Sequence, residues 1–377
     1  MGTVRPQTQA ALAAELANLS GFARIRDRRF ETHIYLAMKS RCDEMVENRL
    51  EQASAEYYGG FRIGDVSVEV VSYHRPDITL VPALAPFRIE TVSPDISIQV
   101  EWVGDLFPTF GRQLFDSGST WRLCEGETGF QFDFCVPAPG RYPCKRLHVD
   151  RCFRRAILQM NCESFVGFPH AVIPLDYPLD ELLIMHRLTQ EKAIELHGCG
   201  IVRADGTGNL FVGHSGAGKS TTTRLWTARE DVEVLSDDRI IVRRDHKKQV
   251  PHRRYAPVRN DMGNFARDDN EKSPGDPGRI LMYGTPWHGE AMYASPNSAL
   301  LARIFVLEHG HGNVITRLSR SQAVAELFAR AFVPFHRHEY VESALTFLEE
   351  VVEEIPVYRY AFEPNEAAVE VVAGFRD

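Results

Sequence analysis

The spacing of apolar residues changes along the chain and divides it into regions of different expected structure. Helical spacing runs through residues 9–19 and 33–57, and between about 61 and 150 it gives way to an alternation with period two. The strings DISIQVEWV and GFQFDFCV show this alternation most clearly, and it is typical of β-strands. The pattern therefore predicts an α+β N-terminal region whose second part is rich in strands.

Helical spacing returns after residue 175 and is followed by short strands and helices in turn. A helix is predicted over 178–189, after the turn-forming string FPHAVIPLDYP. Further strands are predicted at AIELHGCGIV, LFVG, VEVLSDDRIIV, RIFVLE, VITRL and PVYRYAF, and further helices at STTTRLWTAR, 321–332 and 339–354. This order predicts an α/β layer structure, with a domain boundary near 175 between an N-terminal domain (1–175) and a C-terminal domain (176–377).

Two connecting segments interrupt the C-terminal domain. Residues 251–280 have few apolar side chains and a dense mixture of proline, glycine and charge, and Arg253, Arg254 and Arg259 are among the charged residues. A segment of this length and composition is either a plain surface insertion or a lid that closes over a bound ligand. The shorter break HGHGN, between RIFVLE and VITRL, predicts a hairpin turn.

Composition and charge exclude several classes of partner. The chain has 377 residues, of which 44% are hydrophobic and 25% charged, as in an ordinary globular protein. The formal net charge of −8 gives no general attraction to nucleic acid or to an anionic membrane. No run approaches the roughly 18 apolar residues of a membrane span, and the first residues lack the pattern of a signal peptide. We therefore expect a cytoplasmic protein that binds neither membrane nor nucleic acid.

The cysteines and paired histidines give little indication of a disulfide framework or a metal site. The seven cysteines are never spaced C-x-x-C, so we expect them to be reduced and to fill small apolar spaces. Two H-x-H pairs, His309 with His311 and His336 with His338, could chelate a metal only if they lay on strands. The first pair lies in HGHGN between two apolar runs, and we expect it to consist of polar loop residues rather than metal ligands.

The strongest chemical signal is a phosphate-binding loop. The pattern G-x-x-x-x-G-K-[ST] is matched in full by Gly213, His214, Ser215, Gly216, Ala217, Gly218, Lys219 and Ser220, and Thr221 follows. An apolar strand precedes the motif and a helix-compatible run follows it, as the motif requires. Its glycines let backbone N–H groups close around phosphate oxygens, and the helix N-terminus adds partial positive charge. Lys219 would reach the β- and γ-phosphates of ATP, and the Ser220 hydroxyl would bind Mg²⁺.

A pair of carboxylates follows the loop after one further helix and one turn. The apolar string VEVLS (232–236) is followed directly by Asp237 and Asp238. We expect this strand to lie beside the P-loop strand and to deliver both carboxylates to the metal and the γ-phosphate. Asp237 is assigned chiefly to Mg²⁺ and Asp238 to the base that takes the acceptor's proton, and adjacent residues at a strand end could exchange these roles.

Together these motifs resemble the HPr kinase/phosphorylase family, whose P-loop fold is shared with the ATP-dependent phosphoenolpyruvate carboxykinases. The matching strings are LHGCGIV with His197, GHSGAGKST, and LSDD with Asp237 and Asp238. A lone histidine in an apolar strand is more often a core residue, but the resemblance implies that His197 lies near the phosphates. It further implies a kinase domain over 176–377 that uses ATP and Mg²⁺, with Lys219, His197 and both aspartates as its catalytic set.

The chain departs from the family's pattern in two regions. No R-G-x-G-I signature follows the aspartates, and in its place stands YGTPWHGE (283–290), which resembles HPr-kinase-related proteins of peptide-modification clusters, such as those of the SynChlorMet cassette and lasso-peptide kinases. The first 175 residues do not resemble the N-terminal domain of HPr kinases. The resemblance therefore implies a hydroxyl acceptor on another peptide, a protein or a small molecule. We expect 283–290 to be an exposed loop on which Trp287 and His288 face that acceptor.

Three functions from different classes stay open at this point. A kinase would use the second aspartate as a base, which an ATP-driven switch would not need. A carboxykinase-like lyase would need basic residues for a dicarboxylic acid, and the sequence marks none clearly. A nucleotide-binding scaffold or ATPase without transfer would not need the lysine, the serine and both aspartates together. The identity of the acceptor is open, and so is the formation of a homo-oligomer.

Overall fold

The computed structural model describes residues 57–376 with internal gaps, namely 74–77, 91–92, 105, 107–110, 135–142, 166–171 and 246–277. The predicted helix at 9–19 lies outside this description. So does the predicted helix at 33–57 apart from residue 57, and so does the predicted insertion at 251–280 apart from residues 278–280. Residues Ala55–Asp377 belong to one compact unit. It contains two sheets, and the boundary predicted near 175 falls on the stretch of chain that joins them.

The first sheet has eight strands and confirms the β-rich region that the alternation predicted. Its strands are β1 (Tyr57–Ile63), β2 (Val66–Ser72), β3 (Ile96–Val103), β4 (Arg112–Asp116), β5 (Trp121–Glu125), β6 (Gly129–Phe134), β7 (Lys145–Asp150) and β8 (Arg155–Asn161). Their order is β1-β2-β3-β8-β7-β6-β5-β4. Apolar residues of the alternating strings, such as Ile96, Ile98 and Phe132, share a core with helix α3 (Leu179–Leu188).

The second sheet has nine strands and carries the phosphate-binding motif. Its strands are β9 (Ala193–Val202), β10 (Thr207–Val212), β11 (Glu233–Ser236), β12 (Arg239–Asp245), β13 (Arg279–Tyr283), β14 (Ser298–His309), β15 (Val314–Arg317), β16 (Ala331–Phe332) and β17 (Val357–Phe362). The main order is β10-β9-β12-β13-β14-β17-β15, and β10 also pairs with β14, so that five strands close into a ring. Strands β10, β14 and β17 are parallel, and their carboxyl ends therefore share one edge.

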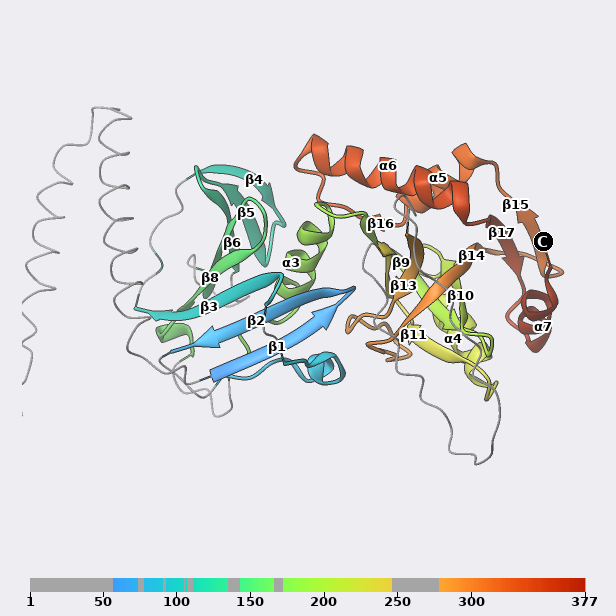
Figure 1. Cartoon of the computed structure of the whole chain (residues 1–377), viewed down its shortest axis with the longest axis horizontal. Coiled ribbons are helices and arrows are strands. Elements are labelled where there is room, and N and C mark those ends of the chain that lie inside the picture. The colour runs from blue at the N-terminus through green and yellow to red at the C-terminus, as the bar shows by residue number, and fades with distance from the viewer. Residues whose placement is uncertain are drawn as a thin grey trace, which may run out of the picture. The chain divides into compact units, whose positions relative to one another are not determined.

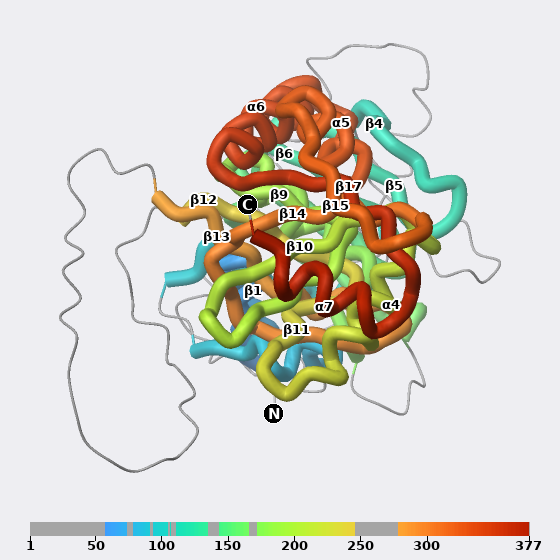
Figure 2. Tube along the Cα trace, turned by 90° about the vertical axis from the view of Figure 1, so that its right-hand side faces the viewer, coloured from blue at the N-terminus to red at the C-terminus, as the bar shows by residue number. Residues whose placement is uncertain are grey.

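Helices cover this second sheet on two faces (Figures 1 and 2). Helices α5 (Arg320–Phe328) and α6 (His338–Glu354) pack on one face, and α4 (Lys219–Thr227) and α7 (Glu366–Gly374) pack on the other. Each face of the sheet has its own apolar core, and successive side chains of β10 point into the two cores in turn. Leu210 and Val212 pack under α5 and α6, while Phe211 packs under α4 and α7. The predicted α/β layer structure is thus confirmed.

Several elements differ from the sequence-based expectation. VEVLSDDRIIV forms two strands, β11 and β12, with a turn at Asp237 and Asp238 between them. The helix predicted over 321–332 ends at Phe328, because residues 331–332 pair with β9. Strands β14 and β15 are not a hairpin, since β17 lies between them, and β13 and α7 were not predicted. In each rearranged case a pairing with a distant strand outweighs the local pattern, which carries no information about it.

Two expectations based on composition can be compared with the described part of the chain. No helix there is long and apolar enough to cross a lipid bilayer. The five cysteines that the structure describes, namely Cys124, Cys144, Cys152, Cys162 and Cys199, are all free.

Candidate functional site

The P-loop has the strand–loop–helix setting that its sequence predicts. Strand β10 ends at Val212, and α4 begins at Lys219. Gly216 and Gly218 have φ angles of +80° and +102°, which L side chains rarely adopt. A Cβ at Gly218 would also lie 2.4 Å from an atom of the Phe362 ring. Both glycines are therefore needed for this loop conformation.

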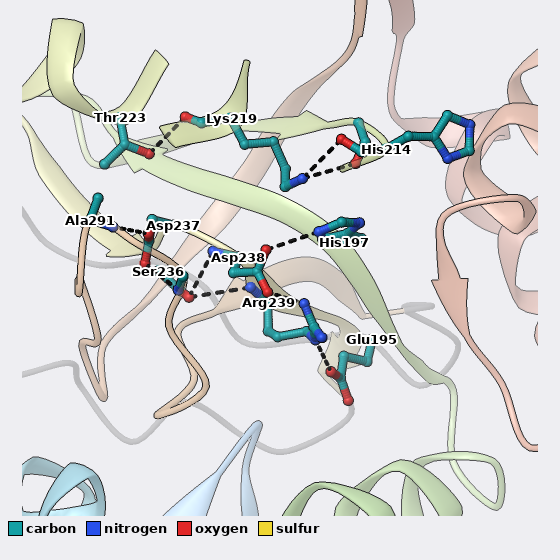
Figure 3. A network of polar contacts seen from close by, with 12 residues as sticks. Glu195, His197, His214, Lys219, Thr223, Ser236, Asp237, Asp238, Arg239 and Ala291 are labelled. Atoms are coloured by element: carbon teal, nitrogen blue, oxygen red, sulfur yellow. Dashed lines mark hydrogen bonds and ion pairs between the residues drawn. The ribbon is translucent and has the colours of Figure 1, made fainter. Parts of the chain in front are cut away.

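Lys219 is bound to the loop that it follows. Its ammonium group donates hydrogen bonds to the carbonyl oxygens of Gly213 and His214, at 3.1 and 3.2 Å. The residue is only 6% exposed, and burial lowers the pKa of its ammonium group. In Figure 3 the side chain extends toward His197 and Asp238. The loop thus holds one cation on the side of the candidate catalytic pair.

Strand β9 connects the loop to the aspartates. The Gly213 N–H donates to the His197 carbonyl at 3.2 Å, and the Gly198 N–H donates to the Asp238 carbonyl at 3.0 Å. A Cβ at Gly198 would lie 2.8 Å from the Phe211 carbonyl oxygen, so glycine allows this close approach. The expectation that β11 lies beside β10 is wrong, because β9 pairs with β10 on one edge and with β11 on the other.

His197 and Asp238 form a pair beside the loop. His197 Nε2 lies 2.9 Å from Asp238 Oδ1, and since a carboxylate only accepts, this nitrogen donates. The other oxygen, Oδ2, is paired with the Arg239 guanidinium. Burial acts to raise the pKa of Asp238, but the bond from His197 and the charges of Arg239 and Lys219 outweigh burial and lower it. Asp238 is therefore an ionised carboxylate with fixed orientation, and it retains partial exposure.

Arg239 is a site residue that the sequence analysis missed. Its Nε donates to Glu181 at 2.9 Å and lies 3.4 Å from the buried Glu195, and its guanidinium stands 4.1 Å from the centre of the Phe332 ring. Burial, reinforced by the neighbouring Glu181, raises the pKa of Glu195 well above its usual value. The string SDDR places this arginine next to Asp238, which is the one signal that could have found it.

Asp237 is turned away from its neighbour and anchors a loop. It is 1% exposed, and its oxygens accept backbone N–H bonds from Gly289 (3.0 Å), Ala291 (2.8 Å) and Tyr293 (3.2 Å). These three donors occupy the carboxylate that the sequence analysis assigned to Mg²⁺. They also bring the segment 289–293 against the turn that carries both aspartates.

The expectation that Trp287 is exposed is wrong, whereas His288 is exposed as expected. Trp287 is 8% exposed, belongs to the core around α3, and donates from Nε1 to Asp180 Oδ2 at 3.0 Å. The glycines and proline around it suggested a surface loop, but a polar partner inside the core accommodates the indole N–H. Burial raises the pKa of Asp180 to about 6, even though the indole N–H acts to lower it.

The site offers oxygen ligands that suit Mg²⁺. Within the described ranges, no group of three or more His, Cys, Asp and Glu side chains could hold a metal ion. Magnesium beside a nucleotide takes most of its ligands from phosphate and water, so few protein ligands are needed. Ser220, in the first turn of α4 and partly exposed, fits this role. Of the two aspartates, Asp238 has the more accessible carboxylate.

The H-x-H pairs are not arranged as metal sites. His309 ends β14, and His311 lies in the turn beyond it. His336 has a buried Nε2, while His338 begins α6 and its side chain is 81% exposed. The two histidines of each pair thus have different surroundings.

Comparison with known proteins gave no matching family model and no similar curated protein. The resemblance to HPr kinases therefore rests on the sequence motifs LHGCGIV, GHSGAGKST and LSDD alone and stays a prediction.

Proposed function

We propose that the protein transfers the γ-phosphoryl group of ATP to a hydroxyl group on another molecule. The observation that supports this most is the position of the His197–Asp238 pair at a P-loop. The backbones of Gly213 and Asp238 are hydrogen-bonded to the adjacent residues His197 and Gly198 of β9, so the first residue of the loop and the backbone that carries the carboxylate are held close together. A scaffold that only bound nucleotide would need the loop but not an oriented carboxylate next to it.

Each residue then has a distinct role. The loop N–H groups and the N-terminus of α4 bind the phosphates, and Lys219 neutralises their charge. Ser220 helps to hold Mg²⁺, which supplies charge neutralisation on the phosphate oxygens. His197 fixes the carboxylate of Asp238, which takes the proton of the acceptor hydroxyl as the new O–P bond forms and the bond to ADP breaks.

The acceptor is proposed to enter beside the segment 288–293. A Cβ at Gly289 would lie 3.0 Å from Asp237 Oδ2 and 3.2 Å from the Asp238 Cβ, so this segment borders the base directly. His288 is exposed at its start and Met292 is 71% exposed near its end. We retain His288 as a candidate contact for the acceptor. Trp287 instead packs in the core around α3 and anchors the start of this segment.

The full chain with MgATP tests the proposal. We expect calorimetry to show Mg²⁺-dependent ATP binding, and γ-labelled ATP to pass its label to a hydroxyl-bearing component of a cell extract, identified by mass spectrometry. Lys219→Met keeps the apolar stem but removes the charge, and should weaken ATP binding about tenfold or more. Arg224→Met, on an exposed position of the same helix, is the matched control.

Equal ATP affinity in Lys219→Met and the unaltered chain would contradict the assignment of the loop. ATP binding with no transfer of label to any extract component would instead favour the nucleotide-binding scaffold.

A further inference from the structure

The carboxyl ends of three parallel strands meet at the phosphate-binding loop. Strand β10 leads into the loop at Gly213, and its neighbour β14 ends at His309. Strand β17 ends at Phe362, which is the register partner of His309. Their rings lie nearly parallel, with 21° between the planes and 6.4 Å between the centres. The loop is therefore contacted by one side chain from each of two further strands, His309 of β14 and Phe362 of β17. Figure 2 shows β10, β14 and β17 near one another.

His309 is bonded to the middle of the loop. Its Nε2 lies 2.8 Å from the carbonyl oxygen of Gly216, and because a carbonyl only accepts, Nε2 carries the proton and donates. The same peptide unit is held at its other end, where the Ala217 N–H donates to the His214 carbonyl at 3.0 Å. One hydrogen bond from outside the loop and one from inside it thus fix the plane of this peptide.

Phe362 fixes the next part of the loop by contact. Its ring occupies the space that a Cβ at Gly218 would need. Gly218 precedes Lys219, the first residue of α4, and its N–H is one of those at the helix N-terminus. Between them, His309 and Phe362 restrain the two loop residues that have left-handed backbone angles.

We propose that His309 is a positioning residue for nucleotide binding, which orders the loop by donating a hydrogen bond to the Gly216 carbonyl. The inference rests on the proposed function, because it requires the loop to bind phosphate. Without the donor, the peptide between Gly216 and Ala217 can rotate, and the loop N–H groups must then be ordered when the phosphates bind. That ordering reduces affinity without removing any group that contacts the nucleotide.

Three variants test the proposal with calorimetry of MgATP binding and melting temperature. His309→Ala removes the donor and should weaken MgATP binding about fivefold, the usual effect of one hydrogen bond. His309→Gln places an amide N–H donor at a similar distance and should restore most of the affinity. His311→Ala is the matched control, because this residue lies two positions further on, in the turn after β14, is fully exposed and is paired with Glu363 rather than with the loop.

The outcomes separate this inference from the proposed function. If His309→Ala lowers the melting temperature but leaves MgATP affinity unchanged, His309 is only a structural residue and the inference is overturned. Failure of His309→Gln to restore affinity would overturn the donor role. If the unaltered chain binds no MgATP, both this inference and the proposed function fall. Intact binding in His309→Ala together with lost binding in Lys219→Met would reject the inference alone.

Discussion

Asp237 and Asp238 are neighbours in the sequence and have opposite surroundings in the fold. They occupy the turn between β11 and β12. The side chain of Asp237 is buried and accepts hydrogen bonds from three backbone N–H groups, whereas that of Asp238 is hydrogen-bonded to His197 beside the loop. The sequence predicted that both are present at the site, but it left their roles exchangeable because adjacent positions cannot be distinguished without the turn geometry.

Asp238→Asn should keep nucleotide binding and lose phosphoryl transfer. An amide is nearly the same shape as the carboxylate but cannot take the proton of the acceptor hydroxyl. We expect MgATP affinity within about threefold of the unaltered chain, and a loss of at least a hundredfold in single-turnover transfer, the usual contribution of a general base. Unchanged single-turnover transfer would refute the role of Asp238 as base.

Asp237→Asn should instead reduce stability. The charge-assisted bonds to three N–H groups weaken, and the amide NH₂ group cannot accept from any of them. With about 1.5–3 kcal/mol for a hydrogen bond to a charged group, the melting temperature should fall by several degrees. Thermal unfolding in the absence of ligand measures this change. A melting temperature equal to that of the unaltered chain, combined with a lost Mg²⁺ dependence of ATP binding, would instead support the original assignment of Asp237 as a Mg²⁺ ligand.

At the scale of elements, the sequence predicted local units and missed long-range pairings. The unit β10–loop–α4 was predicted because its glycines, lysine and apolar run lie within one short stretch. The position of β9 between β10 and β11, and of β17 between β14 and β15, depends on residues far away along the chain. The same limit explains why the partner of Trp287 was not foreseen, since Asp180 lies on a distant helix.

Trp287→Ala should destabilise the protein more than it affects the acceptor. The side chain is packed in the core around α3, and removal of a buried aromatic ring costs about 3–5 kcal/mol. Chemical denaturation should therefore show a clear loss in the free energy of unfolding. Trp287→Phe retains most of the apolar volume but loses the bond to Asp180, and should have an intermediate effect. His288→Ala, at the exposed neighbouring position, should leave stability unchanged; equal stability of Trp287→Ala and His288→Ala would contradict the buried role.

At the scale of the whole described unit, an aromatic cluster joins the first sheet to the segment before α6. His186 of α3 stacks on Phe153, with 4.9 Å between ring centres, and lies 5.1 Å from the ring of His336. Phe130 and Tyr340 contact His336 from β6 and α6. His186 donates from Nδ1 to the Leu182 carbonyl, so its buried Nε2 is unprotonated. The segment before α6 is thus connected to α3 and to the first sheet through two histidines.

These histidines make stability depend on pH in a predictable direction. Burial lowers the pKa of His186 to about 3 and that of His336 to about 4; Arg337 lowers the latter further, and Glu125 acts against it. Since each folded pKa lies below the unfolded value of about 6.5, the unfolded chain binds protons first as the pH falls. The stabilisation is therefore complete above about pH 6.5 and declines below it, by up to about 1.4 kcal/mol per pH unit for the buried His186 and by less for the partly exposed His336.

His336→Phe should flatten this dependence, because it keeps an aromatic ring in the cluster and removes one titrating group. Urea unfolding at pH 7 and pH 5 should give a smaller loss of stability in the variant than in the unaltered chain, with a difference of about 1 kcal/mol, since the partial exposure of His336 reduces the full effect. Burial raises the pKa of Asp180, so the contribution of this residue to stability increases as the pH falls. This contribution is the same in the variant and in the unaltered chain, and it therefore does not affect the difference between them. His338→Gln, at the exposed end of the H-x-H pair, should keep the full pH dependence. If His336→Phe loses as much stability on acidification as His338→Gln, then the pKa of His336 is the same in the folded and the unfolded chain, and burial in the cluster does not disfavour its protonation.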